Sequence, residues 1–247
     1  MRVFVANLVL ALGLSILSAP GLALAQGGSA QDRLEAAASA LEGVQSMRFS
    51  GQTNVTPAST GEPVKVFGGR GEFQSPDRGR MTVEQPLLSQ VNETISVGQL
   101  SWLQTVDGSA WVPLPASAAP PAPRSIADQL RQVSRYMVSP TVNEDDTQMT
   151  ISASVDLARA VSEESPIAAT IGVGFTGDTD QGSLINDSRV VITIDRSSGL
   201  PLSLDTSLAM VPGAPPEGFP AGQLTITTSL TLTDFNSPEV VIRAPGE

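Results

Sequence analysis

Hydrophobic and polar residues alternate most clearly between residues 189 and 206. Every second position is apolar on both sides of a turn at residues 195–199, namely Val190, Ile192, Ile194, Leu200, Leu202 and Leu204. Successive side chains of a strand point to opposite faces, so each triplet forms one apolar face. Gly199 supplies the conformational freedom that a tight turn needs. The pattern predicts a β-hairpin whose apolar face another part of the molecule must cover.

The same alternation recurs along most of the chain. It predicts strands at residues 47–55, 64–74, 80–84, 91–97, 100–106, 147–155, 167–175 and 224–233, with short ones after Trp111 and at 240–242. Asp107-Gly108 is a strong hairpin signal. Consecutive strands joined by short turns favour an antiparallel meander over strand–helix–strand crossovers. The glycines at 68–71 permit sharp bending of their strand.

Helical periodicity interrupts the strands at three places. Apolar residues recur at three- and four-residue spacing over residues 31–44, with Gly43 as a helix stop. A second helix is predicted from Ser125 to Met137, with Ser125 as its N-cap. A short helix is predicted at 156–162. Because the second helix lies within a run of strands, we expect it to pack across the sheet and not to form a separate domain.

The first 25 residues have the pattern of a secretory signal peptide: a basic start, an apolar run and an alanine-rich end. The alternative is a membrane anchor. The apolar run is near the short end for spanning a bilayer, and Pro20 and Gly21 break it. We therefore expect cleavage, a secreted or extracytoplasmic location and no integral membrane protein, with the chain divided into a signal peptide at 1–25, a flexible lead at 26–30 and one domain at 31–247.

Composition removes several classes of function. The net charge is −11, which argues against nucleic acid as a partner and against electrostatic attachment to anionic lipid. Cys and His are absent. Disulfides, zinc sites, the usual catalytic triads and a cysteine-linked lipid anchor are thereby excluded. The acidic residues lie mainly in turns, and no spacing singles out a catalytic pair. The sequence predicts no enzyme and indicates no cofactor.

The apolar stripe of the second helix, Ile126, Leu130, Val133 and Met137, has two interpretations. The helix completes an ordinary core, or it lines a cavity beneath a curved sheet. Aromatic residues make up 4% of the chain, so few large side chains are available to fill a concave face. The candidates for the wall of such a cavity are Leu34, Leu41, Phe49, Trp102, Ile126, Leu130, Val133, Met137, Ile192, Ile194 and Leu202.

The order of these elements resembles a known family. An N-terminal helix leads into L-E-G-V-Q-S-M-R-F-S-G, followed by G-R-G-E-F-Q-S-P-D-R-G-R-M-T-V-E and I-S-V-G-Q-L-S-W. A mid-chain helix, I-D-R-S-S-G-L-P-L-S-L and the ending T-L-T-D-F-N-S-P come next. This is similar to the LppX/LprG-like lipoproteins of the bacterial envelope and, more distantly, to LolA/LolB-like lipoprotein carriers. The resemblance covers nearly the whole chain after residue 25.

The resemblance implies a mainly β (α+β) fold, a half-barrel of strongly curved antiparallel sheet with helices on its concave face around an apolar cavity. It also implies binding of lipids or acylated proteins. This chain lacks the cysteine through which the lipoprotein members are anchored. The sequence therefore favours a soluble carrier that holds an acyl chain, with a second envelope protein as a further partner. The alternative is an interaction or sensor module whose core is filled by its own side chains.

Overall fold

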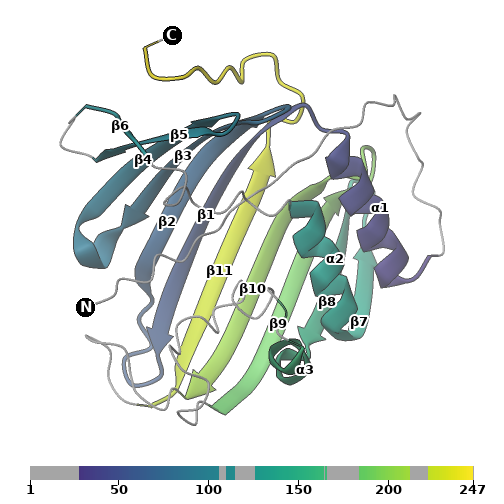
Figure 1. Cartoon of the computed structure of the whole chain (residues 1–247). Helices are drawn as coiled ribbons and strands as arrows, with labels where there is room; N and C mark the ends of the chain where they lie inside the picture. Colours follow the sequence, from purple (N-terminus) through teal and green to yellow (C-terminus); the bar gives the residue numbers. More distant parts are fainter. Residues whose placement is uncertain are drawn as a thin grey trace.

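One curved antiparallel sheet organises the computed structural model, which describes residues 28–105, 110–114, 126–163, 165, 184–211 and 222–246. Eleven strands formed by these residues follow the order β6-β5-β4-β3-β2-β1-β11-β10-β9-β8-β7. The sheet bends strongly without closing, and α1, α2 and α3 lie on its hollow side in front of β7–β10 (Figure 1). The predicted mainly β fold with a curved antiparallel sheet and helices on the concave face is confirmed.

Several strands are longer than the alternation predicts, and β7 is a strand that the alternation does not predict. Their bounds are β1 Ser46–Pro57, β2 Val64–Gln74, β3 Arg78–Gln85, β4 Gln90–Val97, β5 Leu100–Thr105, β6 Val112–Pro113, β7 Met137–Glu144, β8 Gln148–Val155, β9 Leu184–Asp195, β10 Pro201–Val211 and β11 Leu224–Thr233. A short 3-10 helix, η1 (Pro86–Leu88), joins β3 to β4. The predicted strand at 167–175 and the turn at Asp107-Gly108 lie outside the described residues.

Two predicted boundaries are wrong. The chain enters β7 directly after α2, so Met137 begins a strand and does not end the helix. β7 gives a poor sequence signal because it contains Pro140 and has Ser139 at a positive φ of 50°. The predicted strand at 240–242 is an extended segment outside the sheet. The backbone N–H of Ile242 donates to the Gln74 side chain at 2.9 Å instead of to a strand.

The helices begin and end close to where the sequence places them. α1 (Ala30–Glu42) has a capping box in which Ser29 and Asp32 exchange hydrogen bonds, and Gly43 is its C-cap. α2 spans Ile126–Tyr136. α3 (Leu157–Ser162) is capped by the Asp156 side chain, which accepts from the N–H of Arg159.

The principal core lies between the helices and strands β8–β11. Its most deeply buried side chains have no exposed surface and come from both layers: Leu34 on α1, Leu130 on α2, Ile151 on β8, and Ile192 and Ile194 on β9. Complete burial of a Leu or Ile side chain contributes about 1.5–3 kcal/mol relative to exposure. The apolar face of the predicted hairpin, now β9 and β10, is therefore covered by α1 and α2.

Charged groups on the outer side of the helices hold α1 and α2 together. Arg131 of α2 pairs with Glu42 at 2.6 Å and with Glu35 at 3.0 Å, both on α1. These hydrogen bonds raise the pKa of the Arg131 guanidinium above its ordinary value, the bond to Glu42 contributing most. The pairs are partly exposed, so each contributes about 0–1 kcal/mol. They fix the register of the two helices more than they stabilise the fold.

A second charged cluster joins the end of α2 to α3. Glu163 accepts hydrogen bonds from the Tyr136 hydroxyl at 2.8 Å, from Arg135 at 2.8 Å and from Arg159 at 2.9 Å. The guanidinium carbons of Arg135 and Arg159 lie 5.5 and 5.4 Å from the centre of the Tyr136 ring. The hydrogen bonds from Arg159 and then Tyr136 hold the pKa of Glu163 below its ordinary value near 4.5. The charged carboxylate is thus the form that the folded state favours.

We predict that Glu163→Gln lowers stability in a pH-dependent manner. A carboxyl whose pKa is lowered by folding stabilises the protein above its unfolded pKa and loses that contribution as the pH falls through the folded pKa. The urea midpoint of the variant should therefore lie below that of the parent at pH 7, and the difference should shrink below about pH 4.5. Glu62→Gln, at an exposed loop position, is the control. A difference that is the same at pH 7 and pH 3 would refute this role.

Candidate functional site

The strand register places rows of small, mostly apolar residues on the concave side of β11 and β1–β5, the part of the sheet that the described helices do not cover. Direct cross-strand partners face the same side of a sheet. The row that begins at the buried Leu232 of β11 continues through Phe49, Gly71, Met81, Thr94 and Leu103. A parallel row passes through Leu230, Gly51, Gly69 and Val83. These two rows form the floor of the hollow seen in Figure 1.

Glycines lower this floor, and two phenylalanine rings lie beside them. A Cβ at Gly71 would overlap the Phe49 ring and would come within 2.5 Å of the Arg80 carbonyl oxygen. A Cβ at Gly69 would be 3.5 Å from the Phe67 ring, which is an ordinary contact. Phe49 and Phe67 are half-buried and pack against the edge of the core. The floor is therefore uncharged; the Phe49 ring lies over Gly71, and Gly51 and Gly69 add no side chain of their own.

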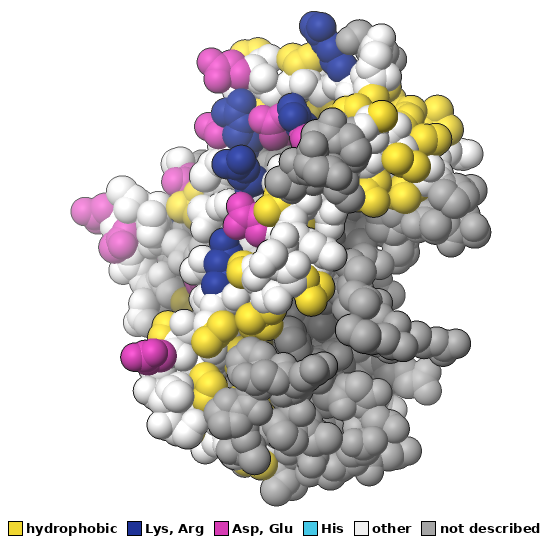
Figure 2. All heavy atoms as spheres, turned by 90° about the vertical axis from the view of Figure 1, so that its left-hand side faces the viewer, with side chains coloured by type: hydrophobic (Ala, Val, Ile, Leu, Met, Phe, Trp, Pro, Cys, Tyr) yellow, Lys and Arg dark blue, Asp and Glu magenta, His cyan; other side chains and the backbone are white. Residues whose placement is uncertain are grey.

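The concave positions of β1–β5 and β8–β11 carry no Asp, Glu, Lys or Arg in the described part of these strands. Their charged residues all occupy the alternate positions and face outward. Arg48 and Glu72 form an outer-face ion pair at 2.9 Å, and Arg80 pairs with Glu93 on the same face. Figure 2 shows such basic and acidic side chains interleaved along one side of the molecule. The concave side is thus suited to an apolar ligand.

All of the predicted cavity residues except Trp102 and Leu202 lie in two regions of this concave side. Most of them belong to the closed core under the helices, where each is at most 9% exposed: Leu34, Leu41, Ile126, Leu130, Val133, Met137, Ile192 and Ile194. Phe49 lies on the helix-free floor. Leu202 is half-buried and lies at the register irregularity between Pro201 and Ser203. The regular alternation of side chains is interrupted there, so Leu202 cannot be assigned to the face of Leu204 by counting residues.

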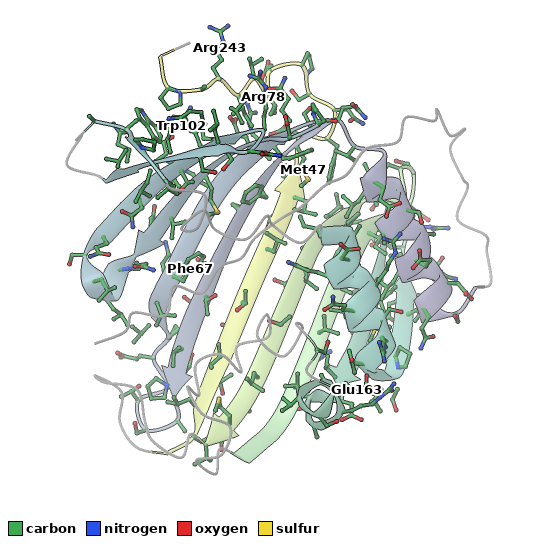
Figure 3. The ribbon with its side chains drawn as sticks, in the orientation of Figure 1. Met47, Phe67, Arg78, Trp102, Glu163 and Arg243 are labelled. Atoms are coloured by element: carbon green, nitrogen blue, oxygen red, sulfur yellow. The ribbon has the colours of Figure 1, made fainter. Side chains whose placement is uncertain are left out.

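Trp102 lies on the opposite face from the one predicted. Its cross-strand partner is Ile95, which pairs in turn with Arg80, and this row faces outward. In Figure 3, Trp102 lies above the upper strands with Arg78 and Arg243, whereas Phe67 lies on the hollow side. Ile95, Val240 and Ile242 are almost fully buried, and they are separate from the principal core. Trp102 therefore belongs to the outer face, next to the C-terminal segment.

Residues that the sequence patterns did not assign to the site are Phe67, Met81 and Val83. Met81 and Val83 were predicted to share a face, but only the register shows that this face is the concave one. The glycines at 68–71 were the strongest available signal, because they indicate that something lies close to the backbone. Within the described residues, no group of three or more acidic side chains could hold a metal ion.

Comparison with known proteins gives structural matches alone. No protein-family model matches the sequence, and neither does any curated protein. The chain is similar to LprF from Mycobacterium bovis, with 15% identity over 87% of this chain and 96% of that chain, and a TM-score of 0.47. It is similar to the lipoprotein LppX from Mycobacterium tuberculosis, with 12% identity over 85% and 97% of the two chains, and a TM-score of 0.48.

A LolA superfamily protein from Nitrosomonas europaea aligns at 11% identity over 85% of this chain and 93% of that chain, with a TM-score of 0.28. LppX and a LolA superfamily protein, which represent the two groups that the sequence motifs resemble, are among these structural matches. At these identities and TM-scores, the ligand has to be inferred from this chain's own side chains. Of the helices in the described residues, none has the length and hydrophobicity needed to cross a bilayer.

We predict opposite outcomes for alanine at two neighbouring glycines of the floor. Gly71→Ala should destabilise the protein by about 1–3 kcal/mol, because the new methyl group overlaps both a ring and a backbone oxygen. Gly69→Ala should change stability by less than about 1 kcal/mol, since its methyl group meets only ordinary contacts. Urea denaturation of the two variants measures the difference. Equal losses in both variants would contradict the described position of the Phe49 ring.

Proposed function

We propose that this chain is an extracytoplasmic carrier that binds the acyl chain of a lipid or lipoprotein against the concave side of its sheet. The observation that carries the proposal is the uncharged floor built by Gly51, Gly69 and Gly71, with Phe49 and Phe67 beside it. An acyl chain requires no charged partner. Each buried methylene contributes about 0.8 kcal/mol, so a dozen contribute on the order of 10 kcal/mol before the costs of binding.

The two halves of the concave side have different parts in this proposal. Over β8–β10 the helices bring their own leucines and alanines onto the sheet, and these positions have little or no exposed surface. Over β1–β3 the described helices are absent (Figure 1), and Phe67, Met81 and Val83 are only half-buried. The acyl chain is placed on the second half, with α2 as the adjoining wall. The signal-peptide pattern of residues 1–25 supports an extracytoplasmic location.

The second candidate is an interaction or sensor module without lipid cargo. The close packing of α1, α2 and β9 favours it, because the side chains of the protein itself cover that half of the hollow. The two functions differ in what is bound to the purified protein. Lipid extraction and native mass spectrometry of the full chain should recover a lipid-bound form if it is a carrier. A lipid-free protein that also fails to take up a fluorescent fatty acid would exclude the carrier.

We predict that Gly69→Leu lowers fatty-acid uptake without unfolding the protein. The position has room for a Cβ, and the leucine side chain would extend over the floor beside Phe67 and occupy the space assigned to the acyl chain. Displacing several methylenes of ligand should weaken binding at least about tenfold. Titration with a fluorescent fatty acid measures the affinity, and the thermal midpoint verifies folding.

Thr225→Leu is the matched control, since Thr225 lies on the outer face of β11 as the cross-strand partner of Thr56. It adds the same side chain to the other side of the sheet and should leave uptake unchanged. If both variants bind the fatty acid like the parent while remaining folded, the acyl chain does not lie on this floor.

A further inference from the structure

The outer face of the sheet contains a pocket that the proposed carrier function does not use. Its volume is about 310 Å³, and residues of β1, β2, β3 and β11 line it: Ser50, Gly51, Gln52, Lys65, Gly69, Arg70, Glu84, Ser229 and Thr231. The side chains of this set belong to the outward positions of their strands. The pocket therefore lies behind the floor of the concave side, with the thickness of the sheet between them.

Small residues, Gly68, Ser50, Ser229 and Thr231, occupy several of the outward positions at this pocket. Gly68 faces outward between Gln52 and Glu84, and the Lys65 side chain lies across it, with Cε 2.5 Å from the place of a Cβ. This position of Lys65 allows its ammonium group to bond Glu84 at 2.8 Å. Ser50 and Thr231, which are direct cross-strand partners, supply hydroxyl groups at the next position.

The charged residues that line this pocket are Lys65, Arg70 and Glu84, which together carry one net positive charge. Lys65 and Glu84 neutralise each other, and the hydrogen bond from Lys65 is the main reason why the pKa of Glu84 is lowered. Arg70, in the described structure, donates no hydrogen bond and forms no ion pair; its charge also acts on Glu84 from a distance. Two further carboxylates lie on the outer face beside the lining residues without lining the pocket themselves. Glu72 pairs with Arg48, and Asp205 accepts hydrogen bonds from the hydroxyls of Ser229 and Ser203.

An arginine with no partner among the described residues is unexpected in a chain with 25 acidic and 14 basic residues. Its guanidinium offers several N–H groups in a fixed plane, a geometry that suits the oxygens of a phosphate. The ammonium of Lys65 and the hydroxyls of Ser50 and Thr231 line the same pocket, and they provide further hydrogen-bond donors on other sides of it. A tetrahedral oxyanion can accept from all of them at once, whereas a planar carboxylate has fewer acceptor directions.

We propose that this outer pocket binds a phosphate group, with Arg70 as its principal charged contact and Lys65, Ser50 and Thr231 as further donors. The phosphate is either free in solution or the head group of a phospholipid. The pocket is open to solvent on the outer face, so neither source has to enter the hollow of the sheet. This binding is independent of the acyl-chain site, and either one can fail without the other.

Amide chemical shifts of the isotope-labelled full chain test the proposal. Inorganic phosphate is one titrant, and a soluble short-chain phosphatidic acid below its micelle concentration is the other. Saturable shifts should centre on residues 50–52 and 68–70. Arg70→Gln should weaken the affinity about tenfold or more, because a hydrogen bond between charged groups is lost. A preference for the lipid over inorganic phosphate would identify the head group as the source, and equal affinity would identify the free ion.

Arg189→Gln is the matched control. Arg189 is an exposed outward residue of β9, and within the described structure it has no ion-pair partner either, but it does not line the pocket. Its replacement removes the same charge and should leave the titration unchanged. The proposal is overturned if neither titrant gives saturable shifts, or if the two variants lose affinity equally, since the effect would then be one of net charge alone.

Discussion

The structure depends on the separation of charge between the two faces of one sheet. The charged residues of β1–β4, β9 and β10 occupy outward positions, several of them in ion pairs, and the described concave positions of β1–β5 and β8–β11 hold no charged residue. Side chains alternate with a period of two, so a shift of one residue in β1, β2, β3, β4, β9 or β10 would bring charges into the hollow. The cost of burying a charge without a partner is large. The need to keep the concave side uncharged therefore constrains the register of these charged strands, and through their pairing that of their neighbours.

The uncharged concave side of the sheet is covered differently in its two halves. Over β8–β10, helices α1 and α2 contribute the side chains that complete a closed core, and the capping box and the pairs of Arg131 fix their ends and register. Over β1–β3, glycines occupy several concave positions and contribute no side chain, and the rings of two phenylalanines lie against two of these glycines. The first half stabilises the fold, and the second half supplies a surface that a flexible acyl chain fits.

Local patterns predict much of this fold because the strands alternate strictly and the helix ends carry clear capping residues. Gly43 ends α1 as the sequence indicates, and the short helix predicted at 156–162 is found with Asp156 as its N-cap. Alternation identifies which residues share a face, but it does not say which face is concave. Trp102 shows the limit: it shares a face with Ile95, and the register places that face outside. Met137 and Leu202 fall at a helix-to-strand junction and at a bulge, where the periodicity changes.

Photo-crosslinking of a diazirine-bearing fatty acid to the full chain, followed by peptide mapping, locates the bound acyl chain on the sheet. If the acyl chain binds to the concave side, an excess of unlabelled fatty acid suppresses the labelling, and the labelled peptides contain concave residues of β1–β3, including Phe49, Phe67 and Met81. Labelling confined to the outer face around Trp102, or labelling that unlabelled fatty acid does not suppress, would contradict binding to the concave side.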